Sequence, residues 1–131
     1  MVVDSSAFTA MIVGERERDL FEDLILRTPT AVISVATVVE ISIVLRNKRQ
    51  DAEAEVLDQL LSNLGLDVRP LDVSQGKLAR DAFAKYGKGR HPAGLNFGDC
   101  FSYALAKARG DTLLFKGDDF AKTDIMPAWR P

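Results

Sequence analysis

The 131-residue sequence predicts an α/β fold of three layers, in which a mostly parallel sheet of four to five strands lies between two layers of helices. Two observations predict it. Short runs rich in valine, isoleucine and leucine alternate along the chain with longer segments of helical periodicity. The short runs are apolar throughout, which is typical of strands buried on both faces of a parallel sheet. We expect one domain over residues 1–131, since no segment has the composition of a linker.

The first half of the chain has clear end signals. Asp4-Ser5-Ser6 both ends a strand and caps a helix, and Thr28-Pro29-Thr30 breaks the next helix. That next helix is amphipathic, with Leu20 expected inward and Glu17 outward. The expected elements are a strand at 1–3, helices at 7–13 and 15–27, a strand at 31–35 and a buried helix at 37–47.

The second half continues the alternation. Asn96 is a good N-cap with Asp99 three residues later, and Gly110 supplies a left-handed stop to that helix. The leucines of the helix expected at 52–64 form a stripe that indicates core or dimer surface. Ile125-Met126 is a candidate edge strand. The expected elements are a helix at 52–64, a strand at 66–69, a helix at 74–86, a basic loop at 87–94, a helix from 97 and a strand at 112–115.

Composition places limits on function. The chain is 47% apolar and 27% charged, as in an ordinary globular protein, and its net charge is −2. That balance does not indicate a nucleic-acid binder, although bound metal ions could offset a local cluster of acids. No apolar run approaches the ~20 residues of a membrane span, and the opening lacks the basic start of a signal peptide. Cys100 is the only cysteine, so no disulfide forms within the chain and a cytoplasmic location is the simplest expectation.

Acidic residues stand at four places that the fold pattern does not explain. Asp4 ends the first strand, Asp118 and Asp119 follow the last, Glu40 lies in an apolar helix and Asp99 opens another. If the first and last strands are neighbours, the strand order reverses between them, and ligands bind at such a point in open α/β sheets. We expect the four acids to converge there.

Each acid also has a purely structural interpretation. Asp4 and Asp99 could be helix caps, and Asp118 and Asp119 could be turn residues. Glu40 is harder to explain in this way, because an ionised group on an apolar helix face needs a partner. Taken singly the signals are weak, and their joint arrangement is the stronger evidence.

Four converging carboxylates would repel one another without a cation between them. Oxygen ligands in that number suit Mg²⁺ or Mn²⁺, and a single histidine, His91, with a single cysteine, Cys100, argue against zinc. Two such ions roughly 4 Å apart are a common arrangement for phosphodiester cleavage. The residues therefore favour metal-dependent hydrolysis of a phosphodiester.

A family resemblance covers nearly the whole chain. The sequence resembles the PIN-domain ribonucleases, most closely the VapC toxins of bacterial toxin–antitoxin pairs, in the segments VVDSSA, ISVATVVEISIVL, LNFGDCFSYALAK and LLFKGDDF. The resemblance implies a Mg²⁺- or Mn²⁺-dependent endoribonuclease whose acidic ligands correspond to Asp4, Glu40 and Asp99. The usual position of the fourth acid falls on Gly117, so Asp118 or Asp119 must serve. We expect Asp118 by a narrow margin, with Asp119 capping the short helix that follows.

The resemblance also implies partners: an RNA substrate, a small antitoxin protein and a second copy of the chain. Ser5 matches a small hydroxyl residue that the family often has beside its first aspartate. Weak candidates for RNA contacts are Ser5 and, in the basic loop, Lys88, Arg90 and His91, with a solvated surface as the alternative for the loop. Two other functions are considered: a non-catalytic binding module with this fold, and a haloacid-dehalogenase-like phosphatase. The phosphatase needs a second aspartate where this chain has Ser6.

Overall fold

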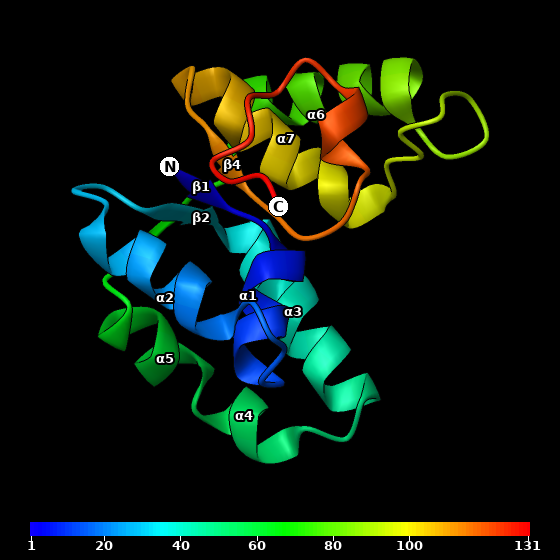
Figure 1. Cartoon of the computed structure of the whole chain (residues 1–131). Coiled ribbons are helices and arrows are strands. Elements are labelled where there is room, and N and C mark those ends of the chain that lie inside the picture. The colour runs from blue at the N-terminus through cyan, green and yellow to red at the C-terminus, as the bar shows by residue number, and fades with distance from the viewer.

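A computed structural model describes all residues, Met1–Pro131, and its centre is a four-stranded parallel sheet in the order β3-β2-β1-β4 (Figure 1). The predicted sheet and the predicted three-layer α/β fold are confirmed. The strands are short and their bounds are β1 Val2–Val3, β2 Val32–Ser34, β3 Asp67–Arg69 and β4 Leu113–Leu114.

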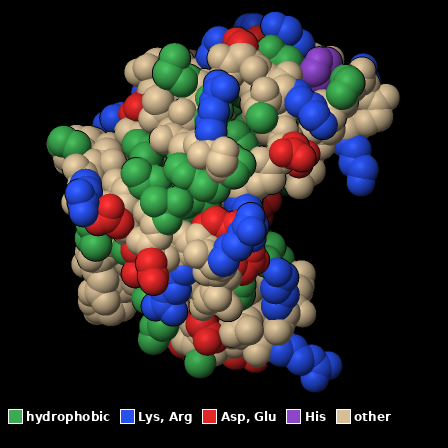
Figure 2. All heavy atoms as spheres, viewed as in Figure 1, with side chains coloured by type: hydrophobic (Ala, Val, Ile, Leu, Met, Phe, Trp, Pro, Cys, Tyr) green, Lys and Arg blue, Asp and Glu red, His purple; other side chains and the backbone are tan.

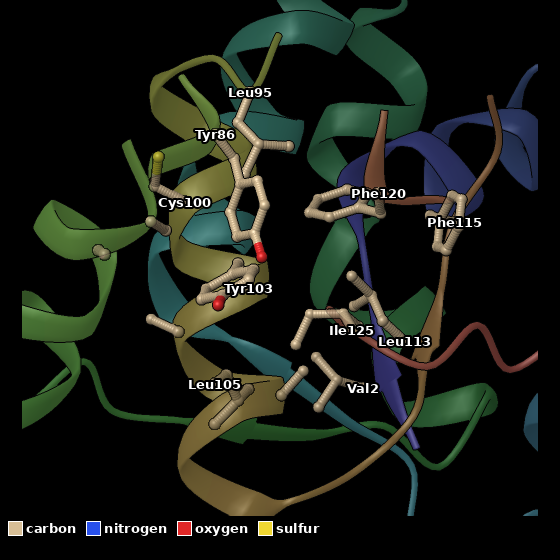
Figure 3. Close-up of a cluster of buried hydrophobic side chains, with 14 of the residues drawn as sticks. Val2, Tyr86, Leu95, Cys100, Tyr103, Leu105, Leu113, Phe115, Phe120 and Ile125 are labelled. Carbon is tan, nitrogen blue, oxygen red and sulfur yellow. The ribbon is translucent and has the colours of Figure 1, made fainter. Parts of the chain in front are cut away.

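Helices cover both faces of the sheet, with α6 and α7 on one side and α1 to α5 on the other (Figure 1). Successive strand residues point to opposite faces, so Val2 and Leu113 join the core under α6 and α7, while Val3 and Leu114 join the other core. Figure 3 shows the first of these cores. The helix bounds are α1 Ser5–Ile12, α2 Arg18–Arg27, α3 Val35–Asn47, α4 Asp51–Glu55, α5 Leu57–Asn63, α6 Val73–Tyr86 and α7 Phe97–Arg109.

Three predicted helices differ from the structure. The helix at 37–47, expected to be buried, exposes Val39 and Ile43 on one face of α3. The helix expected at 52–64 is broken at Val56, which is exposed and non-helical. Arg46 of α3 bonds Asp51 and Glu55 and holds α4 at the end of α3, while Leu57 and Leu61 of α5 pack into the core.

The third difference lies at the start of α2, which begins at Arg18 rather than at 15. The turn before it carries Glu17 inward, where it is buried and pairs with Arg16 and Lys116. Leu20, expected inward, is exposed instead. The amphipathic pattern was therefore one turn too long at its N-terminal end.

The predicted ends of α7 are confirmed. Asn96 and Asp99 form a reciprocal capping box, and Gly110 adopts a left-handed conformation with φ of 61°. After β4 comes a short 3-10 helix, η1 Phe120–Lys122, and the tail then returns along β4. There it forms a single parallel bridge, Leu113 to Pro127, in place of the expected edge strand. No helix in the structure combines the length and apolar character needed to cross a membrane.

Candidate active site

The carboxyl ends of β1 and β4 lie side by side and bring the N-terminal and C-terminal acids to one edge of the sheet. Val3 pairs with Leu114, and the Asp4 N–H donates to the Leu114 carbonyl at 2.9 Å. The first and last strands are therefore neighbours, which is the condition under which the acids are expected to converge. The loop after β4, residues 115–119, starts beside Asp4.

Asp4 is held at this edge by the first turn of α1. Its side chain is 1% exposed, and Oδ2 accepts hydrogen bonds from the Ser6 N–H at 3.0 Å and the Ser6 hydroxyl at 2.6 Å. Its other oxygen, Oδ1, is buried and has no hydrogen-bond partner. Asp4 is thus a helix cap through one oxygen and offers the other to a ligand.

Glu40 reaches the same place from α3. A Cβ on Gly98 of α7 would overlap the Glu40 carboxylate, so this carboxylate lies directly against the first turn of α7. Its Oε1 is buried without a partner. Burial raises the pKa of Glu40, interaction with the Ser5 hydroxyl lowers it, and the charge of Asp4 raises it further.

Asp99 stands in the first turn of α7, next to Gly98. Its Oδ2 accepts the Asn96 N–H at 2.9 Å within the capping box. Burial raises the pKa of Asp99 to about 7; the Asn96 N–H opposes the rise, and the charges of Asp4, Asp119 and Glu40 add to it. Three carboxylates from separate segments of the chain therefore act electrostatically on Asp99.

The two aspartates after β4 face different surroundings. Asp119 is the one whose charge acts on Asp99. Asp118 instead lines a hollow together with Arg16 and Trp129, and Asp119 does not line it. Asp119 directly precedes η1 at the N-cap position, but its side chain makes no capping hydrogen bond, so its expected role as a cap is wrong. The placement thus favours Asp119 over Asp118 as the fourth acid.

The basic loop between α6 and α7 packs more tightly than its sequence suggests. His91 Nδ1 accepts the Ala93 N–H at 3.0 Å, and its ring lies edge-on to Tyr86 with centroids 5.0 Å apart. Lys88 and Arg90 are exposed. His91 therefore shapes the loop, and the two cations are the residues free to meet a ligand.

Two residues that matter for the geometry were missed as site residues. Ser6 was considered only as a cap and as an unmatched phosphatase position, yet its hydroxyl also accepts the Lys116 N–H at 3.0 Å and so joins Asp4 to the end of β4. Gly98 gave no signal beyond its place before Asp99. A glycine in the first turn of an otherwise well-formed helix is the feature that could have revealed it.

The donor set suits a hard divalent cation. Two carboxylate oxygens, Asp4 Oδ1 and Glu40 Oε1, are buried without partners, and burial of unpaired acceptors is costly unless a ligand satisfies them. No three acidic, histidine or cysteine side chains converge closely enough to enclose an ion by themselves. A bound Mg²⁺ or Mn²⁺ would complete its shell with water, as Mg²⁺ commonly does.

Comparison with known proteins identifies the family of the chain. Residues 1–126 match the model of the PIN domain family. Ribonuclease VapC42 of Mycobacterium tuberculosis is 39% identical over 129 residues, which cover 98% of both chains. Ribonuclease VapC of Mycolicibacterium smegmatis is 42% identical over 95% of this chain and 97% of its own. The chain belongs to the PIN domain family and, within it, to the VapC ribonucleases.

Solved structures show the same fold at low sequence identity. The Mycobacterium tuberculosis toxin VapC20, described as cleaving the sarcin-ricin loop, superposes with a TM-score of 0.69 at 17% identity, covering 96% of this chain and 98% of that one. A toxin–antitoxin complex from Klebsiella pneumoniae gives a TM-score of 0.70 at 18% identity, covering 94% and 92%.

Proposed function

We propose that the protein is a Mg²⁺- or Mn²⁺-dependent endoribonuclease, the toxin of a type II toxin–antitoxin pair. The observation that carries the metal dependence is the pair of buried carboxylate oxygens, Asp4 Oδ1 and Glu40 Oε1, that have no partner in the protein. In this proposal, residues 1–131 form one PIN domain, which contains all the proposed ligands, from Asp4 to Asp119.

Asp4, Glu40, Asp99 and Asp119 would hold the ion directly or through water. When bound, the ion supplies a water molecule of lowered pKa and stabilises charge that develops on the phosphate. Asp4 and Asp99 are held by Ser6 and by the capping box, so they need little rearrangement. With its pKa near 7, Asp99 carries a proton in part of the molecules at neutral pH, and it would release that proton when a cation binds.

The space around these acids could admit an RNA strand. Figure 2 shows a notch in the molecule between the half with α6 and α7 and the half with α1 and α3, with acidic side-chain atoms at its back. Basic and acidic side chains are interspersed over this face rather than separated. RNA binding would then rest on the metal site and on a few cations such as Lys88 and Arg90, rather than on one extended basic surface.

The other two functions receive less support. Ser6 occupies the position where a haloacid-dehalogenase-like phosphatase needs its second aspartate, and its hydroxyl is committed to Asp4 and Lys116. A non-catalytic binding module would have no use for buried carboxylate oxygens without partners, which raise the free energy of the folded state.

Two protein partners belong to the proposal, and the cytoplasm is its expected location. A small antitoxin is expected because structural neighbours include toxin–antitoxin complexes. A second copy is expected to cover the exposed apolar side chains of α3 and the start of α7, which are Val35, Val39, Ile43 and Phe97.

Cleavage of a labelled RNA by purified protein tests the proposal. Treatment with EDTA should abolish cleavage, and Mn²⁺ in excess should restore it. Asp4→Asn, purified in the same way, controls for contaminating ribonucleases and should stay inactive with Mn²⁺. Cleavage that survives EDTA, or an active Asp4→Asn protein, would contradict the metal-dependent mechanism.

A further inference from the structure

The Glu40 carboxylate occupies the space where any residue other than glycine at position 98 would place its side chain. For a Cβ built on Gly98, the three nearest atoms all belong to this carboxylate, and the overlap with Oε2 and Cδ is severe. Gly98 is buried and lies within α7. Most helical positions gain from a side chain, since glycine costs about 0.5–1 kcal/mol relative to alanine. The glycine therefore needs a reason other than helix formation.

The position of this contact in the molecule supplies that reason. Gly98 directly precedes Asp99, so the Glu40 carboxylate that packs against Gly98 lies near Asp99. Burial is the main cause of the raised pKa of Asp99, and the charge of Glu40 adds to it. Glu40 Oε1 has no hydrogen bond, so the carboxylate is held by its interaction with the Ser5 hydroxyl and by close packing against Gly98.

The packing of the two helices keeps α3 at the matching height. Thr37 Oγ1 and Ser102 Oγ lie 3.2 Å apart in the core and form the only side-chain hydrogen bond between α3 and α7. Thr37 precedes Glu40 by three residues and Ser102 follows Asp99 by three, so both pairs share a helix face. The hydrogen bond between Thr37 and Ser102 thus fixes the two helices in the register that places the Glu40 carboxylate against Gly98.

We propose that Gly98 is a positioning residue that acts through Glu40. Because Gly98 has no side chain, the Glu40 carboxylate can pack against α7 beside Asp99 and Asp4, where it can bind a divalent cation. This inference rests on the proposed function. It predicts that a methyl group at position 98 displaces Glu40 without harming the helix, because the obstructing atoms are the end of a flexible side chain.

The test is a double-mutant cycle with Gly98→Ala and Glu40→Ala, read out as the dissociation constant for Mn²⁺ and the melting temperature of the metal-free protein. Gly98→Ala should weaken Mn²⁺ binding about tenfold, as is typical when groups that orient a ligand are changed. Its melting temperature should be equal to or above that of the wild type. In the Glu40→Ala background, the same glycine substitution should leave Mn²⁺ binding unchanged.

Gly76→Ala is the matched control, because Gly76 also lies in a helix, α6, and no atom stands within 4 Å of the place that its added methyl group would take. It should affect stability alone. Unchanged Mn²⁺ binding in Gly98→Ala would overturn the inference, and so would a loss of equal size in the Glu40→Ala background. If the wild type itself does not bind Mn²⁺, the proposed metal dependence fails instead, so the two failures are distinguishable.

Discussion

The Ser6 hydroxyl donates a 2.6 Å hydrogen bond to Asp4 Oδ2 and accepts the Lys116 N–H at 3.0 Å, so one side chain joins the ends of β1 and β4. Ser6→Ala removes a bond to a carboxylate and leaves a backbone N–H without its partner. We expect a loss of about 1–3 kcal/mol in the free energy of unfolding, measured by urea denaturation. Mn²⁺ binding should also weaken, because Asp4 loses one of the two bonds that orient it.

Ser62→Ala is the control for this substitution, because Ser62 is exposed on α5 and its hydroxyl makes no hydrogen bond. It should match the wild type in both measurements. A Ser6→Ala protein with lower stability but wild-type Mn²⁺ affinity would limit Ser6 to a structural role.

A pH dependence of stability follows from the raised pKa of Asp99. The folded state keeps a proton on Asp99 up to about pH 7, whereas the unfolded chain releases it near the ordinary value of 3.8. The folded state therefore binds more protons in this window, and its contribution to stability falls as the pH rises from about 4 to about 7. In metal-free protein, Asp99→Asn should remove this part of the slope and raise the melting temperature at pH 8 relative to the wild type.

The same substitution separates a metal ligand from a helix cap. Asparagine can still accept the Asn96 N–H, so the capping box survives and the fold should be kept. Mn²⁺ should raise the melting temperature of the wild type and have little effect on Asp99→Asn, which should not cleave RNA. Wild-type cleavage by this variant would refute the assignment of Asp99 as a ligand.

The elements that the sequence predicted well are those with local signals at their ends. The capping box of Asn96 and Asp99 and the left-handed Gly110 are encoded by residues close together in the sequence. The pairing of β1 with β4 is a condition for the expected convergence of the acids, and the structure shows it. The break at Val56 was not predictable, because it depends on Arg46 reaching from another helix. A glycine in the first turn of a helix is a local signal for Gly98, but its role depends on Glu40, a side chain from a distant part of the chain.

The hydroxyl pair between α3 and α7 gives a separate stability prediction. Thr37→Val leaves the buried Ser102 hydroxyl without a partner, and Ser102→Ala does the same to Thr37. Each single change should lower the free energy of unfolding by about 1–3 kcal/mol, whereas the double variant should lose less than the sum, because no polar group is then unpaired. Additive losses in urea denaturation would show that the hydroxyls do not depend on each other.

The two aspartates after β4 give the sharpest test of the site. Phe120 is buried against Phe115, with ring centroids 5.2 Å apart, and so anchors the turn that presents Asp119 toward Asp99. Asp119→Asn should weaken Mn²⁺ binding and RNA cleavage about tenfold or more. It should also lower the pKa of Asp99, because one of the charges that raise it is removed. Its melting temperature should change little, since Asp119 makes no capping hydrogen bond.

Asp118→Asn is the matched control one residue away and should behave like the wild type, because Asp118 faces the hollow beside Arg16. If Asp118→Asn loses Mn²⁺ binding and Asp119→Asn keeps it, the fourth acid is Asp118 and the turn after β4 presents the other side chain to the metal.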